Sequence, residues 1–206
     1  MRFKYKTYIV YLIWIILLIS YSIASSEFRW NRWQSTLVTF TSAFVVHVIV
    51  RKMYHRHYGI IYYDQSNFDQ AIVANDNAII LDPKDALAHF NRGVAYHHKG
   101  MLDRAIEDYN QALALKPERA CVPLVYNNLG TALFKKEVYD QAIDYYTKAL
   151  KIKPKNANSY YGRGEAYAAK GLTSNALADF KMFLKYAESK DSRIEEAQKH
   201  IRELSG

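Results

Sequence analysis

The chain has 206 residues, a formal net charge of +8 and a single cysteine, so no disulfide can form within it. The charge is uneven, because residues 1–58 hold eight Lys and Arg against one acid and residues 59–206 hold twenty against nineteen. The larger part lacks the basic stripe with interleaved aromatics that nucleic-acid binding needs, so no nucleic-acid partner is expected.

Two apolar segments come first in the chain. Residues 8–24 and 34–50 contain no charged side chain, and each matches the ~17–25 residues of a membrane-spanning helix. The joint between them, residues 25–33, is short and carries Trp30 and Trp33, which suit a membrane–water interface. The sequence predicts that residues 1–50 form a membrane anchor of two transmembrane helices.

Flanking cations predict the orientation of this anchor. Three cations precede the first segment and three follow the second, whereas the joint holds two: Arg2, Lys4, Lys6, Arg51, Lys52 and Arg56 against Arg29 and Arg32. The positive-inside rule therefore places both termini, and the rest of the chain with them, on the cytoplasmic side or its stromal or matrix equivalent. The polybasic flanks could also touch anionic membrane lipid.

Two alternatives remain open for this region. Residues 1–24 have the basic start, apolar run and small residues of a cleaved signal peptide; the second segment alone would then be the anchor, and the rest could lie on either side. The second segment could instead be a buried helix of a soluble domain, since hydroxyl residues and His47 dilute it.

A repeat of about 34 residues follows the anchor. It is visible when Gly59, Gly93, Gly130 and Gly164 are aligned. An alanine follows each glycine by twelve residues (Ala71, Ala105, Ala142, Ala176), and the position four residues later holds Asn75, Tyr109, Tyr146 and Phe180. Internal similarity at this period indicates a stacked array in which no unit buries its apolar face alone.

Each repeated position has a physical role in a helical hairpin. Gly and Ala allow the two helices of a hairpin to approach closely, and the aromatic fills the gap toward the next unit. Pro83, Pro117 and Pro154 end the second helix, while Gly100 and Gly171 mark the turn inside the hairpin. The pattern thus predicts an all-α chain of helix–turn–helix units.

The spacing and these positions resemble the tetratricopeptide repeat over roughly residues 52–190. The resemblance implies an all-α fold in which an N-terminal transmembrane helical hairpin precedes an α-solenoid of four repeats. The expected units are residues 52–85, 86–119, 123–156 and 157–190, within a repeat domain of residues 51–190. Residues 191–206 are expected to be a capping helix, with Ile194, Ala197, Ile201 and Leu204 on its apolar face.

Some positions depart from the pattern. The spacing from Gly93 to Gly130 is 37 residues, which predicts a longer connection around residues 120–122 that ends at Pro123. The fourth unit has Phe183 in place of alanine, as suits a terminal unit, and the first has Asn75 in place of an aromatic.

The resemblance also implies a concave groove lined by the first helix of each unit. The residues placed there are Phe90, Asn91, Val94, His97 and His98 from the second unit; Asn127, Asn128, Thr131, Phe134 and Lys135 from the third; Asn158, Tyr161, Glu165 and Ala169 from the fourth; and Arg56, Ile60 and Tyr63 from the first. Asparagines there could bond a peptide backbone, or they could be purely structural.

Several specific activities are not expected. The two-carboxylate clamp by which some relatives grip chaperone tails would need Lys, Asn and Arg at places that here hold residues such as Ile60 and Leu124. The paired histidines lack further ligands at metal spacing, and no phosphate loop or nucleophile–base pair is present. We therefore expect no enzyme activity, cofactor, metal or small-molecule substrate.

The sequence thus favours a non-catalytic, membrane-anchored protein that binds a protein partner in its groove. Because no flexible linker separates Val50 from the first repeat, that partner is expected to be membrane-embedded or membrane-adjacent. The favoured role is a scaffold or assembly factor for a membrane protein complex, and membrane-anchored repeat proteins that assist photosystem assembly have a similar layout. The alternative is a tethered receptor for client proteins in targeting or secretion.

Overall fold

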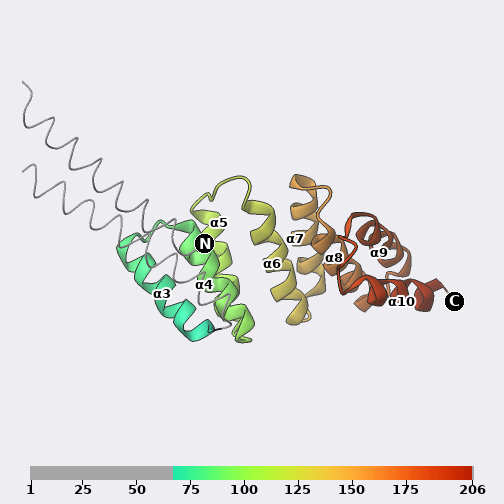
Figure 1. The fold of residues 1–206 in the computed structure, drawn as a ribbon, viewed down its shortest axis with the longest axis horizontal. Helices are drawn as coiled ribbons and strands as arrows, with labels where there is room; N and C mark the ends of the chain where they lie inside the picture. Colours follow the sequence, from blue (N-terminus) through green and yellow to red (C-terminus); the bar gives the residue numbers. More distant parts are fainter. Residues whose placement is uncertain (1–66, 206) are drawn as a thin grey trace, which may run out of the picture.

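The structure is a computed structural model that describes residues 67–205, which contain eight α-helices and no strand. The helices are α3 (Phe68–Leu81), α4 (Ala86–His98), α5 (Leu102–Ala114), α6 (Val122–Lys135), α7 (Tyr139–Ile152), α8 (Ala157–Ala169), α9 (Thr173–Tyr186) and α10 (Ile194–Ser205). Figure 1 shows that they follow one another along the long axis of the molecule, as in a solenoid. The all-α solenoid predicted from the repeat is confirmed.

Consecutive helices form tight hairpins, α4 with α5, α6 with α7 and α8 with α9. The turns of the first and last hairpins contain Gly100 and Gly171 with φ of 74° and 73°, which glycine adopts without steric cost. The middle hairpin has Glu137 at the matching place, with φ of 61°. The two glycine turns were predicted, whereas the left-handed glutamate was not.

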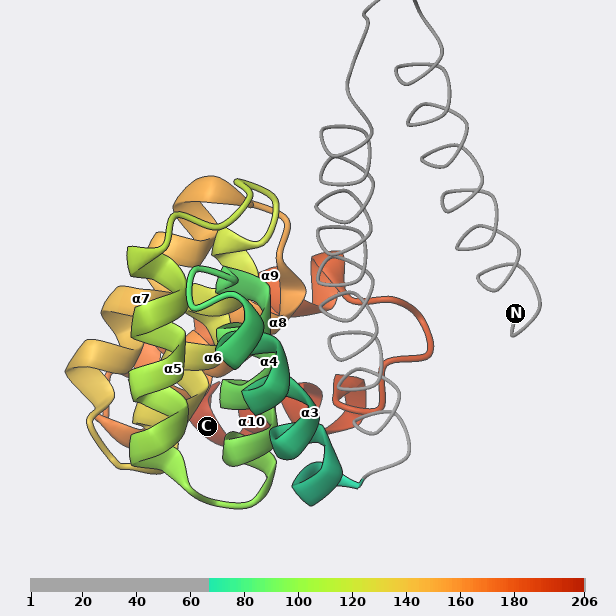
Figure 2. The same cartoon turned by 90° about the vertical axis from the view of Figure 1, so that its left-hand side faces the viewer.

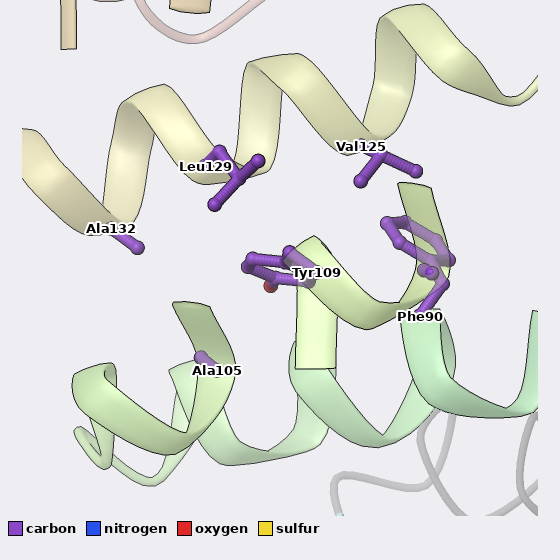
Figure 3. Packing of buried hydrophobic residues seen from close by; sticks show 7 residues of the cluster. Phe90, Ala105, Tyr109, Val125, Leu129 and Ala132 are labelled. Carbon is purple, nitrogen blue, oxygen red and sulfur yellow. The ribbon is translucent and has the colours of Figure 1, made fainter. Parts of the chain in front are cut away.

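The predicted aromatic position builds the core between units. Tyr109 of α5 is fully buried, and its cluster includes Phe90 of α4 together with Val125 and Leu129 of α6. Figure 3 shows the Tyr109 ring between the second unit and helix α6. Each unit therefore completes its neighbour's core, as expected for a stacked array.

The first helices form a layer of their own, since α4 contacts α6 and α6 contacts α8. In the view along the array, α5 and α7 lie to one side of α4 and α6 (Figure 2). This arrangement places any groove of the described residues on the α4–α6–α8 layer.

The connection between α5 and α6, residues 115–121, is longer than the four-residue connections 82–85 and 153–156. The predicted insertion is therefore confirmed, but its end is not where we expected. Pro123 lies in the first turn of α6 rather than in the loop, because a proline there lacks only a hydrogen bond that the first turn would not make.

Ion pairs repeat along the array. Lys99, Lys136 and Lys170 bond to the aspartates of the preceding units, Asp69, Asp103 and Asp140. A second set is more buried: the Arg92 guanidinium bonds Asp108 at 2.6 and 2.8 Å and Asp76 at 2.7 Å, and Arg163 repeats this with Asp179.

Helix α10 closes the C-terminal end. Ala197 is fully buried, and Ile194, Ile201 and Leu204 pack against the cluster that contains Phe180 and Phe183. The apolar face expected for a capping helix is thus the face that packs.

None of the helices within residues 67–205 is both long and apolar enough to cross a membrane. The transmembrane helices expected over residues 8–24 and 34–50 lie outside the described residues, as do the groove positions expected at Arg56, Ile60 and Tyr63.

Candidate functional site

A pocket of about 470 Å³ opens on the layer of first helices, between α4 and α6. Eight of its lining residues are groove positions expected from the sequence: Phe90, Asn91, Val94, His97, His98, Asn128, Thr131 and Lys135. Tyr109 and Leu124 complete the lining. The volume lies within the range typical of ligand pockets.

The two additional residues differ in how far they are exposed. Leu124 is 48% exposed and adds an apolar side chain to the lining. The chaperone clamp needs a charged residue at the position of Leu124. The sequence analysis therefore used Leu124 only as evidence against a clamp and did not predict it as a lining residue. Tyr109 was expected solely as a core residue; it does fill the core, and it also reaches the pocket.

Asn91 lines the pocket, and its Nδ2 atom is buried without a hydrogen-bond partner among the described residues. A buried donor that makes no hydrogen bond costs about 1–3 kcal/mol. An acceptor supplied by a ligand would remove this cost. Asn128 lines the pocket from the opposite helix. Asn91 and Asn128 thus line one pocket, and their recognition of a peptide backbone stays a prediction.

The electrostatics of the pocket come from one lysine and two histidines. Burial lowers the pKa of His97 to about 4, with contributions from Lys135 and His98. Burial and Lys135 also lower the pKa of His98, whose ring stacks on Phe68 at 4.9 Å. Both rings are therefore neutral at pH 7, and Lys135 is the charged residue of the lining.

Two groove residues expected from the third unit have structural contacts instead. Asn127 is buried, and its Oδ1 accepts a hydrogen bond from Ser159 Oγ at 2.9 Å. This bond ties α6 to α8, so Asn127 is not part of the pocket lining. Phe134 packs against Tyr139 at 5.6 Å, inside its own hairpin.

Two groove positions of the fourth unit contact the chain's own C-terminal segment. Arg193 donates to Asn158 Oδ1 at 2.6 Å, and its guanidinium lies 5.1 Å from the centre of the Tyr161 ring. Tyr161 is buried against Phe183 at 5.0 Å. Neither side chain lines the pocket, and no sequence signal identified Arg193 as their partner.

Glu165, the third groove residue expected from this unit, lies near an acid of the cap. Burial raises its pKa to about 7, and the neighbouring Glu196 adds to this increase while Arg193 opposes it. The first-helix layer therefore changes character along its length, from cationic at Lys135 to acidic at Glu165. Across residues 67–205 no group of His, Cys, Asp or Glu is arranged to hold a metal ion.

Comparison with known families agrees with this geometry. One tetratricopeptide-repeat model matches residues 86–119, and a second matches residues 59–100 and 130–171. Together the matches cover residues 59–119 and 130–171, half of the chain. No curated protein matches the sequence.

Several solved structures are similar. A crystal structure of MamA is 30% identical, with a TM-score of 0.58, over 64% of this chain and 75% of that chain. PilF of Pseudomonas aeruginosa is 21% identical, with a TM-score of 0.65, over 77% and 69%. YrrB, described as a protein with an unusual peptide-binding site, is 22% identical, with a TM-score of 0.57, over 73% and 79%. The last two likenesses concern the fold alone.

Proposed function

This chain belongs to the tetratricopeptide-repeat family, and from that premise we propose that it holds a protein partner at a membrane through the pocket between α4 and α6. Members of this family mediate protein–protein interaction and peptide binding. The observation that carries the proposal is the pocket itself. It combines an exposed apolar residue, Leu124, with the amide of Asn128 and a donor of Asn91 that has no partner within residues 67–205.

These features favour an extended segment as the ligand. A peptide backbone offers regularly spaced acceptors and donors, which asparagine amides can satisfy, and an apolar side chain of the segment can anchor between Phe90 and Leu124. A deep enclosed cavity would suit a small molecule better, whereas this pocket lies on an open layer of helices. The role is that of a scaffold or assembly factor and includes no catalytic step.

The same proposal includes the membrane. Residues 8–24 and 34–50 are the candidate spanning segments, with the repeats on the cytoplasmic or equivalent side. A rigid array close to the bilayer would meet membrane-embedded or membrane-adjacent partners, and subunits of a membrane complex are the favoured class.

The single cysteine allows the topology to be tested. Cys121, the N-cap residue of α6, is partly exposed, so a membrane-impermeant maleimide should label it only after sealed cells or organelles are permeabilised. The matched variant carries Cys121→Ser and Ser26→Cys, which moves the thiol to the joint between the two segments. It should be labelled without permeabilisation. Labelling of Cys121 in sealed compartments would contradict the proposed orientation.

Partner docking is tested with a photo-crosslinking residue in place of Leu124. We expect it to capture one defined set of membrane-complex subunits, and the yield should fall when Asn91→Ala and Asn128→Ala are added. The control places the same crosslinker at Glu107, an exposed residue of α5, where no such set should be captured. Equal capture at both positions, unaffected by the asparagine changes, would show that the groove does not bind the partner. Brief capture of many clients would favour a receptor over a scaffold.

A further inference from the structure

We propose that the pocket between α4 and α6 recognises an acidic segment, in which an apolar side chain seats on Leu124 and a carboxylate about five residues along the segment pairs with Lys135. This inference rests on the proposed function, since it specifies the chemistry of the segment that the groove binds. It does not reproduce the chaperone clamp, because Lys135 occupies none of the clamp's places.

The charge of Lys135 is not neutralised by the described part of the chain. No acid among residues 67–205 forms an ion pair with it, and no carboxylate lines the pocket. The next residue, Lys136, has the same charge and points to the other side, where it bonds Asp103 of the preceding unit. Two consecutive lysines thus differ in one respect: the array supplies an anion for Lys136 and leaves Lys135 to a ligand.

The apolar part of the pocket lies within the same lining. Phe90 and Val94 of α4 and Leu124 of α6 supply hydrophobic surface. Leu124 lies in the first turn of α6 and Lys135 is its last residue, so the two are about 16 Å apart along the helix. The buried Nδ2 of Asn91 requires an acceptor, which a backbone carbonyl of the bound segment would provide. One segment can therefore use the apolar surface, the amide and the cation together.

The charged residues along the groove favour one position for the acidic residue of the ligand. Toward α8 the layer carries Glu165, which lies near Glu196 and Arg193 of the C-terminal segment. Arg193 already pairs with Asp191, whereas Lys135 can attract a carboxylate of the ligand.

The test uses the intact chain in a mild detergent and a displayed library of random ten-residue peptides as the probe. The wild-type chain should enrich peptides with Asp or Glu about five residues from Leu, Ile, Met or Phe. Lys135→Glu should reverse the charge preference to Lys or Arg, whereas Lys136→Glu should leave the acidic preference unchanged. For one enriched peptide, Lys135→Gln should raise the Kd about fivefold and reduce its dependence on salt, while Lys136→Gln changes neither.

The outcomes separate this inference from the proposed function. Enrichment of apolar peptides without acids, abolished by Leu124→Arg, would overturn the acidic preference and leave groove docking intact. The same preference in the Lys135→Glu and Lys136→Glu chains would overturn the role of Lys135. Absence of any enriched peptide from the correctly folded wild-type chain would count against both proposals.

Discussion

The Tyr146 ring of α7 packs against the backbone of Gly162 in α8 so closely that a Cβ on Gly162 would lie 2.5 Å from its hydroxyl oxygen. The ring is also held on its other side, since a Cβ on Gly130 would lie 2.8 Å from it. Tyr146 is 1% exposed, and its hydroxyl bonds Thr131 Oγ1 at 3.1 Å. Two glycines from successive units therefore enclose one aromatic.

We predict that Gly162→Ala destabilises the array by about 1–3 kcal/mol, because the fixed ring cannot make room for a methyl group. Gly164→Ala is the matched comparison: its Cβ would lie 3.1 Å from Phe180, so its cost should be smaller. Denaturant unfolding of both variants gives the two free energies, and an equal cost would show that Tyr146 can move.

Glu137→Gly should stabilise the array by roughly 0.5–1 kcal/mol. Glu137 has φ of 61°, a conformation that costs a non-glycine residue about 1–2 kcal/mol; the entropy of a glycine in the unfolded chain offsets part of the gain. Thermal unfolding would detect the increase. The reverse change at the matching turn, Gly100→Glu, should destabilise by a similar amount, and a gain there would contradict the argument.

Arg92→Leu should cost about 3 kcal/mol, because it leaves the buried carboxylate of Asp108 without its main partner. The pairing with Asp108 also raises the pKa of Arg92 above its ordinary value, so Arg92 stays charged at any working pH. The third unit has an apolar pair, Leu129 and Tyr145, at the matching places.

Placing the same residue types, Leu and Tyr, at positions 92 and 108 of the second unit should therefore restore most of the stability that Arg92→Leu loses. In a double-mutant cycle, Arg92→Leu with Asp108→Tyr is expected to be more stable than Arg92→Leu alone. Strictly additive losses would mean that the two positions do not form an exchangeable pair.

Glu165→Gln should stabilise the protein at pH 8 and have little effect near pH 4.5. The pKa of Glu165 in the folded chain, about 7, lies above its ordinary value of 4.5. The folded state therefore favours the protonated form, and this contribution is complete below pH 4.5 and lost as the pH rises through 7. Glutamine keeps the neutral form at all pH values.

The gain at pH 8 should be about 1 kcal/mol once solvent screening of this half-buried group is allowed for. Melting temperatures at the two pH values provide the measurement. Glu195→Gln, an exposed change on α10, should shift neither. A gain from Glu165→Gln that is the same at both pH values would point to packing rather than charge.

The helices and the core were predictable because both follow from local rules repeated along the chain. Gly93, Ala105 and Tyr109 recur at fixed spacing, and stacking makes each recurrence equivalent. Asn75 occupies the aromatic position in the first unit and is fully buried all the same. Its Nδ2 donates a hydrogen bond to the Ala71 carbonyl of its own helix at 2.8 Å.

The candidate site was predictable only in part, because groove positions differ in their tertiary partners. Asn127 and Asn128 are adjacent in sequence, yet Asn127 bonds Ser159 and Asn128 faces the pocket. Arg193 comes from outside the repeats and contacts Asn158 and Tyr161. Such contacts depend on which residue approaches from another unit, and the repeat pattern carries no information about that.

The closed C-terminal end limits how copies of this protein can join. Helix α10 presents Glu195, Gln198, Lys199 and Arg202 outward, so a second molecule stacking there would have to desolvate these polar side chains. End-to-end stacking through this face is therefore disfavoured, although the described repeats stack on one another by the same rule. The cap thus replaces an apolar stacking face with a polar one.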